Sequence, residues 1–90
     1  MFQTRKFVVE GGRTGLIRFS EGEASGQLEW EMLVGEIAMV VYPGSCWWLQ
    51  PEERAMTQDE IRRLVAEFAA QSKLKVEIAF ATGSEIVHPA

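Results

Sequence analysis

Residue types that often carry catalysis are few in this sequence and stand far apart. Cys46 is its one cysteine and His88 its one histidine. A cysteine nucleophile needs a nearby base to form the thiolate, whereas Cys46 precedes two tryptophans in an apolar stretch, which favours the neutral thiol. One cysteine and one distant histidine also do not supply the four ligands of a zinc site. We therefore expect no catalytic residue, no metal site, no cofactor and no enzymatic activity.

Glu29 and Glu31 are the acidic pair whose spacing could serve chemistry. They stand two residues apart in an alternating segment, so on a strand both carboxylates point to the same face. Such a pair can bind a hard cation or act as the acid and base of a glycosidase. A glycosidase also needs a deep sugar cleft, for which a chain of this length has little material. A solvated acidic face is the favoured interpretation.

The adjacent tryptophans Trp47 and Trp48 are candidates for binding rather than catalysis. Neighbouring residues on a strand point to opposite faces, so both indoles cannot enter one core. One of them must face outward or pack under a loop, and the sequence leaves open which. An exposed tryptophan is a frequent anchor of protein interfaces. The alternative is that this indole caps the sheet edge or the end of a helix.

Two hairpins are expected to position these residues. The first runs from 6 to 20 around a Gly-rich turn, and a polar loop follows at 21–25. The second joins strands at 27–33 and 37–42 through a tight turn. Its inner face is expected to carry Leu28, Trp30, Met32, Ile37, Met39 and Val41. Its outer face is expected to carry Glu29, Glu31, Leu33, Ala38, Val40 and Tyr42.

The tight turn of the second hairpin is expected at Gly35-Glu36, because glycine suits the first central position of a type II′ turn. This turn pairs Met32 with Met39. The alternative is a turn at Val34-Gly35, which changes the partners but keeps the same residues on the same faces.

A helix over 58–72 has the clearest signals in the chain. Thr57 is the expected N-cap, and Glu60 completes a capping box with it. Apolar residues then recur at helical spacing and predict a buried stripe: Ile61, Leu64, Val65, Phe68 and Ala69.

Shorter elements are expected on either side of this helix. Pro43-Gly44 predicts a turn, followed by another short strand at 45–50. After the helix, alternation predicts a final strand at 74–80 and then a loose tail at 85–90. The fold class is therefore α+β: an antiparallel four- or five-stranded sheet followed by one amphipathic helix and a final strand, with the helix packed on one face of the sheet. The 90 residues are expected to form a single domain.

The charges favour a protein partner over nucleic acid or a membrane. The net charge is −4, and the segment 19–53 contains seven acidic residues and no basic one, whereas nucleic-acid binding needs clustered lysines and arginines. No apolar run approaches the roughly 20 residues that cross a bilayer, and the N-terminus lacks the apolar segment of a signal peptide. With a single cysteine, nothing indicates an oxidising compartment, so a cytoplasmic location is expected.

The segment 36–80 contains a further pattern: an apolar strand ending in tyrosine, a serine and a tryptophan shortly after it, and a proline before a helix with a threonine cap. In this pattern the segment resembles the immunity proteins of bacterial polymorphic toxin systems, in particular the immunity protein family numbered seventy-four. The matching positions are Tyr42, Ser45, Trp48, Pro51 and Thr57. The resemblance implies a small α+β protein that binds and neutralises a cognate toxin domain without a cofactor. It implies no catalytic residues.

A non-catalytic protein-binding domain is therefore expected, of the kind that inhibits a toxin. Many toxin domains act on nucleic acids and are basic, so an acidic partner would associate with them quickly and selectively. The alternative is a self-associating structural or regulatory module, as a homodimer or as a subunit of a larger assembly. The expected protein interface consists of Glu29, Glu31, Val40, Tyr42, Trp47 and Trp48.

Overall fold

Alternating and β-branched segments form strands, and the amphipathic segment forms a helix, in the computed structural model of this protein, which describes residues 5–89. The strands are β1 (Lys6–Gly11), β2 (Thr14–Glu21), β3 (Ala24–Met32), β4 (Met39–Gln50), β5 (Arg54–Ala55), β6 (Val76–Phe80) and β7 (Gly83–Val87). The helix α1 spans Gln58–Ser72. The strands join into one sheet in the order β1-β2-β3-β4-β6-β7, with β5 paired to β4. Only β4 and β6 pair in parallel within the described residues, because α1 connects them, and the predicted α+β class is confirmed.

The first hairpin, of β1 and β2, depends on two glycines that stand opposite each other. Gly11 has a φ of 101°, which residues with a side chain rarely adopt. A Cβ on Gly15 would lie 1.9 Å from the carbonyl oxygen of Glu10. The backbones of β1 and β2 can approach this closely only because glycine has no Cβ. The predicted hairpin is confirmed. The polar loop expected at 21–25 is shorter, because Gly22 turns the chain directly into β3 with a φ of 59°.

The central hairpin, of β3 and β4, has the register that the sequence predicts. Trp30 is paired with Val41, and Met32 with Met39. The side chains of Leu28, Trp30, Met39 and Val41 are buried on the inner face, as expected. The type and alternation of the residues were therefore sufficient to orient this pair of strands.

Two of the expected inner-face residues are not buried. Met32 is paired with Met39 and shares its face, but it lies at the end of the ladder and is 52% exposed. Ile37 lies half-buried in a loop at 33–38 instead of in a strand. The Leu33 amide donates across the loop to the carbonyl oxygen of Ala38 at 3.0 Å, and the Ala38 amide donates to the carbonyl oxygen of Lys75 at 2.9 Å. The loop is thus tied to the segment that precedes β6, and the ladder ends before the strands reach their turn.

Strand β4 continues through the position where the sequence predicts a turn. Residues 43–46, which include Pro43-Gly44, stand opposite the single residue Leu28. Such a bulge absorbs extra residues without ending the strand, and it tolerates a proline, which cannot donate a hydrogen bond to the ladder. The short strand expected at 45–50 is therefore the second half of β4.

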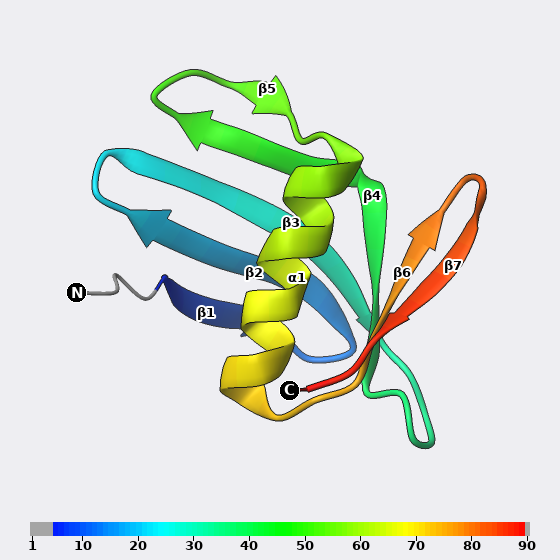
Figure 1. Ribbon diagram of the computed structural model, residues 1–90. Helices are drawn as coiled ribbons and strands as arrows, with labels where there is room; N and C mark the ends of the chain where they lie inside the picture. The colour runs from blue at the N-terminus through cyan, green and yellow to red at the C-terminus, as the bar shows by residue number, and fades with distance from the viewer. Residues whose placement is uncertain (1–4, 90) are drawn as a thin grey trace.

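Helix α1 begins and ends where the sequence predicts. Thr57 is its N-cap, and the reciprocal hydrogen bonds with Glu60 form the expected capping box. Lys73 closes the helix in a left-handed conformation with a φ of 61°. The buried stripe is Ile61, Leu64, Val65, Phe68 and Ala69. It packs on one face of the sheet, across which the helix lies in Figure 1, and meets there a core that includes Ile17, Phe19, Leu28, Trp30, Met39, Val41, Val76 and Ile78.

The segment predicted as a loose tail at 85–90 is a strand up to Val87, and residue 90 lies outside the described residues. Gly83 turns the chain with a φ of 138°, and β7 then pairs antiparallel with β6 up to Val87. Arg62 of α1 donates two hydrogen bonds to Glu85, at 2.9 and 2.7 Å, which attach β7 to the helix. None of the five residues of β7 is fully buried. Its sequence therefore needs no alternation of apolar and polar residues, which is the signal that predicts a strand.

Candidate protein-interaction surface

Helix α1 lies across one face of the sheet (Figure 1). The opposite face, here called the open face, carries most of the residues that the sequence singles out. Paired residues on adjacent strands point to the same side, so the register identifies the side chains on this face. Glu29 is paired with Tyr42. Val40 is paired with Glu31 on one side and with Glu77 on the other. These five side chains therefore form one surface, contributed by β3, β4 and β6.

Three carboxylates, those of Glu29, Glu31 and Glu77, lie near the phenol of Tyr42. The Tyr42 hydroxyl donates a hydrogen bond to Glu31. This bond, with partial desolvation and the negative charges of the three carboxylates, raises the pKa of Tyr42 above its ordinary value. Among residues 5–89 none of the three forms an ion pair with a lysine or arginine, whereas other acids such as Glu67 do. The open face thus carries a local negative charge that the described chain does not balance.

The two tryptophans point to opposite faces, and the bulge in β4 decides which one is outward. It shifts the alternation of the strand, so that Trp47 stands opposite Gln27 on the open face, with 39% of its surface exposed. Trp48 stands on the core face, where its ring packs edge-on against Phe19 with 5.5 Å between ring centroids. Trp48 therefore does not lie with the other five candidate residues.

Val40 and Glu77 show where the sequence was less informative. Val40 lies on the open face as expected, but it is only 5% exposed because it lies between the longer side chains of Glu31 and Glu77. It can supply little contact area. Glu77 was not among the candidates, although its place between the buried Val76 and Ile78 shows that it points away from the core. Its position beside Val40 depends on the parallel pairing of β4 and β6, which no local pattern reveals.

The open face is hollowed where β2, β3 and β4 adjoin. A depression of about 300 Å³ is lined there by Thr14, Gly15, Leu16, Glu29, Trp30, Glu31 and Tyr42. Its polar wall consists mainly of two carboxylates and a phenol, which favour a cationic or hydrogen-bonding side chain from a partner.

Cys46 is enclosed in the core. Its side chain is 1% exposed, and its thiol donates a hydrogen bond to the carbonyl oxygen of Tyr42 at 3.3 Å. Burial raises the pKa of this thiol to about 12. His88 is exposed beyond the end of β7. In the described part of the chain no three His, Cys, Asp or Glu side chains gather into a group that could hold a metal ion.

Because the thiolate is the reactive form, Cys46 is expected to resist a thiol reagent in the native protein. Ellman's reagent at neutral pH should label it far more slowly than it labels free glutathione. After unfolding in guanidinium chloride, one thiol per chain should react at the rate of glutathione. Rapid labelling of the native protein, with unchanged circular dichroism, would contradict the buried position.

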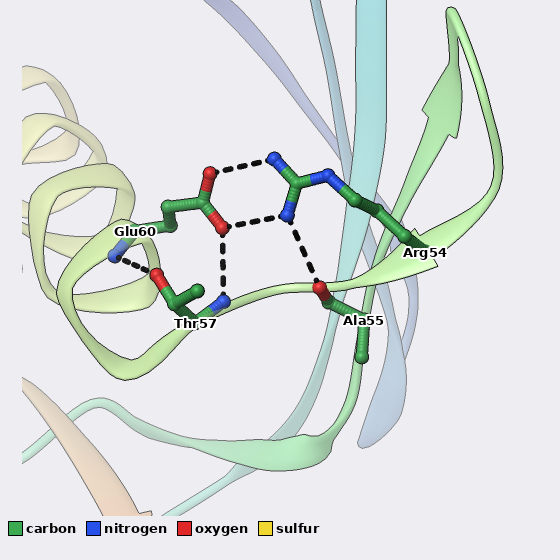
Figure 2. A network of polar contacts seen from close by, with 4 residues as sticks. All are labelled: Arg54, Ala55, Thr57 and Glu60. Atoms are coloured by element: carbon green, nitrogen blue, oxygen red, sulfur yellow. Dashed lines mark hydrogen bonds and ion pairs between the residues drawn. The ribbon is translucent and has the colours of Figure 1, made fainter.

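A network of polar contacts joins the short strand β5 to the start of α1 (Figure 2). Arg54 donates two hydrogen bonds to the carboxylate of Glu60, at 3.0 and 2.8 Å, and a third to the carbonyl oxygen of Ala55 at 3.3 Å. Glu60 also accepts from the Thr57 amide at 2.9 Å. The Arg54 guanidinium lies 5.5 Å from the centre of the Trp48 ring. The network therefore fixes the helix start against Trp48.

Glu60 gives this network a pH dependence. The Arg54 guanidinium, followed by the Thr57 amide, holds the pKa of the Glu60 carboxyl well below its usual range. The indole N–H of Trp48 also favours the ionised form, although it makes no hydrogen bond of normal geometry. Because the folded pKa lies below the unfolded one, the stabilisation is complete above about pH 4.3 and is lost as the pH falls further.

The variant Glu60→Gln keeps an acceptor for the capping box but removes the charge. Its melting temperature is expected to be lower than that of the wild type near pH 6, and this difference should shrink as the pH is lowered toward 3. Glu53→Gln makes the same chemical change at an exposed position and is the control. A difference that stays constant over this range would show that the Glu60 charge does not stabilise the fold.

The fold and the surface together define a class: a small α+β protein with one sheet face covered by a helix and the other acidic, aromatic and uncovered in the described residues. Comparisons with protein-family models, with curated proteins and with solved structures found no match for this chain. Within residues 5–89 no helix is long and apolar enough to span a membrane.

Proposed function

We propose that this protein is a non-catalytic inhibitor of the immunity type, which binds a basic toxin domain through the open face of its sheet. The observation that carries the proposal is the grouping of exposed Trp47 and half-buried Tyr42 with the unbalanced carboxylates of Glu29, Glu31 and Glu77. An aromatic anchor beside charges of one sign gives both contact area and selection for a partner of opposite charge.

The resemblance to immunity proteins supports this proposal through the framework more than through the contact surface. Thr57 caps α1, and Trp48 packs in the core beside the Arg54 and Glu60 network. Tyr42 is the matching residue that lies on the open face. A shared framework with a variable open face would allow related inhibitors to recognise different toxins.

The experiment is co-expression with a candidate toxin, namely the C-terminal domain of a large protein encoded by the neighbouring gene. The wild-type protein should restore growth of cells that express this domain and should co-purify with it. The double variant Glu29→Lys/Glu31→Lys should protect less well. The control Glu52→Lys/Glu53→Lys makes the same change of charge at exposed positions in the turn between β4 and β5 and should protect like the wild type. The proposal fails if such toxin domains are neither bound nor neutralised by the folded wild-type protein.

A further inference from the structure

The charges on the open face are divided between two opposite corners. Lys6 lies on β1 and Arg18 on β2. Through the pairing across β3, both stand toward the end of the sheet that contains the last residues of β4. The carboxylates of Glu31 and Glu77 lie at the other end, on β3 and β6. Arg18 is paired with Glu10 at 2.8 Å, whereas Lys6 is exposed without an ion pair among the described residues. One face thus presents a basic corner and an acidic corner diagonally opposite.

We propose that, in the absence of another partner, a second copy of this chain covers the open face in a two-fold symmetric dimer. A two-fold axis lying in the interface, along the diagonal that passes Leu16 and Trp47, would place the basic corner of each copy over the acidic corner of the other. Both contacts form at once, because a two-fold interface is self-complementary. The strands of the two sheets then cross at a steep angle, as in orthogonal sheet packings.

Two apolar residues lie on this axis, Trp47 of β4 and Leu16 of β2. Trp47 is 39% exposed, and Leu16 is half-buried on the same face. Between them the axis crosses β3 between Gln27 and Glu29. On the proposed axis each Trp47 meets its own counterpart, so its exposed area is buried twice in one dimer. The apolar contact therefore lies at the centre of the interface and the charged contacts at its corners, which is the usual arrangement of protein interfaces.

The size of the face agrees with a weak dimer. Strands lie about 4.8 Å apart and alternate residues about 7 Å apart, so four rows over four to five strands cover roughly 600 Å² per copy. The total of roughly 1,200 Å² is at the lower end of stable interfaces, for which a dissociation constant on the order of 10–100 μM is expected. The inference goes beyond the proposed function, because the occupant of the face is the protein itself.

Sedimentation equilibrium of the purified protein, with no toxin present, tests the dimer. The wild type should change from monomer to dimer as its concentration rises through the micromolar range. Glu29→Lys/Glu31→Lys should stay monomeric, because lysines would then face Lys6 and Arg18. Adding Lys6→Glu and Arg18→Glu to that variant exchanges the two corners and should restore the dimer. Trp47→Ser should be monomeric.

The control Glu52→Lys/Glu53→Lys should dimerise like the wild type, and circular dichroism should show that every variant is folded. A wild type that stays monomeric up to about 1 mM, ten times the weakest expected dissociation constant, would overturn the proposal. So would a Glu29→Lys/Glu31→Lys variant that dimerises as the wild type does. The result is independent of toxin neutralisation: a monomer that neutralises a toxin refutes the dimer alone, and a dimer that neutralises none refutes the proposed function alone.

Discussion

Phe68→Ala is expected to lower the free energy of unfolding by about 3–5 kcal/mol, the cost of truncating a buried aromatic side chain. Phe68 is 3% exposed and lies on the buried stripe of α1. Its ring meets that of Phe7 edge-on, with 5.6 Å between centroids, so the substitution leaves a cavity between the helix and β1. Since small domains are stable by only about 5–15 kcal/mol, the variant should be close to unfolding at room temperature.

Urea denaturation followed by circular dichroism measures this loss. Arg63→Ala is the control on the same helix, because Arg63 is exposed and its replacement removes no buried contact. It should change the free energy of unfolding by less than about 0.5 kcal/mol. If Phe68→Ala has the same midpoint urea concentration as the wild type, Phe68 does not pack between α1 and the sheet as described.

Trp47→Ala is expected to weaken binding to the cognate toxin domain by upwards of about 2 kcal/mol, roughly 30-fold, mainly through faster dissociation. The sequence left open which tryptophan is the anchor. Trp47 is the candidate because it is exposed on the open face, whereas Trp48 packs against Phe19 in the core. The fold should be retained, because the Trp47 side chain points away from the core. Val34→Ala, at a fully exposed apolar residue in a loop, is the control and should bind normally.

The acidic residues are expected to act on the other rate. Glu29→Lys/Glu31→Lys should slow association, and this effect should shrink as salt is raised, because surface charges are screened within about 10 Å at 0.1 M salt. Surface plasmon resonance at several salt concentrations separates the two rates. If Glu52→Lys/Glu53→Lys slows association equally, net charge alone attracts the partner and the open face has no special part in it.

The elements that local chemistry specifies could be predicted closely. The helix from Gln58 to Ser72 has a cap, a capping box and an apolar stripe, each of which depends on residues within two turns of one another. The register of β3 and β4 followed from alternation and from one turn signal at Gly35. β7 was missed because its residues are half-exposed and its stability depends on β6 and on the bond between Arg62 and Glu85.

The candidate surface was predicted in part, for a related reason. Alternation alone puts Glu29, Glu31 and Tyr42 on one face, and the structure agrees. Alternation also implies that Tyr42 and Trp47 point to opposite sides, since they are an odd number of residues apart. The bulge in β4 puts Tyr42 and Trp47 on the same side instead. It forms because β4 has more residues than β3 between two paired positions, which depends on how the two strands pair.

By itself, then, the sequence determined the helix, its buried stripe and the faces of the central hairpin, because these depend on neighbours along the chain and on the periods of helix and strand. The tertiary structure alone decided that Glu77 joins Glu29 and Glu31, that Trp47 is outward and Trp48 inward, and that Cys46 is enclosed. Each of these depends on which strands pair and where a ladder slips. Such pairings are set by burial summed over the whole sheet, and no single segment encodes them.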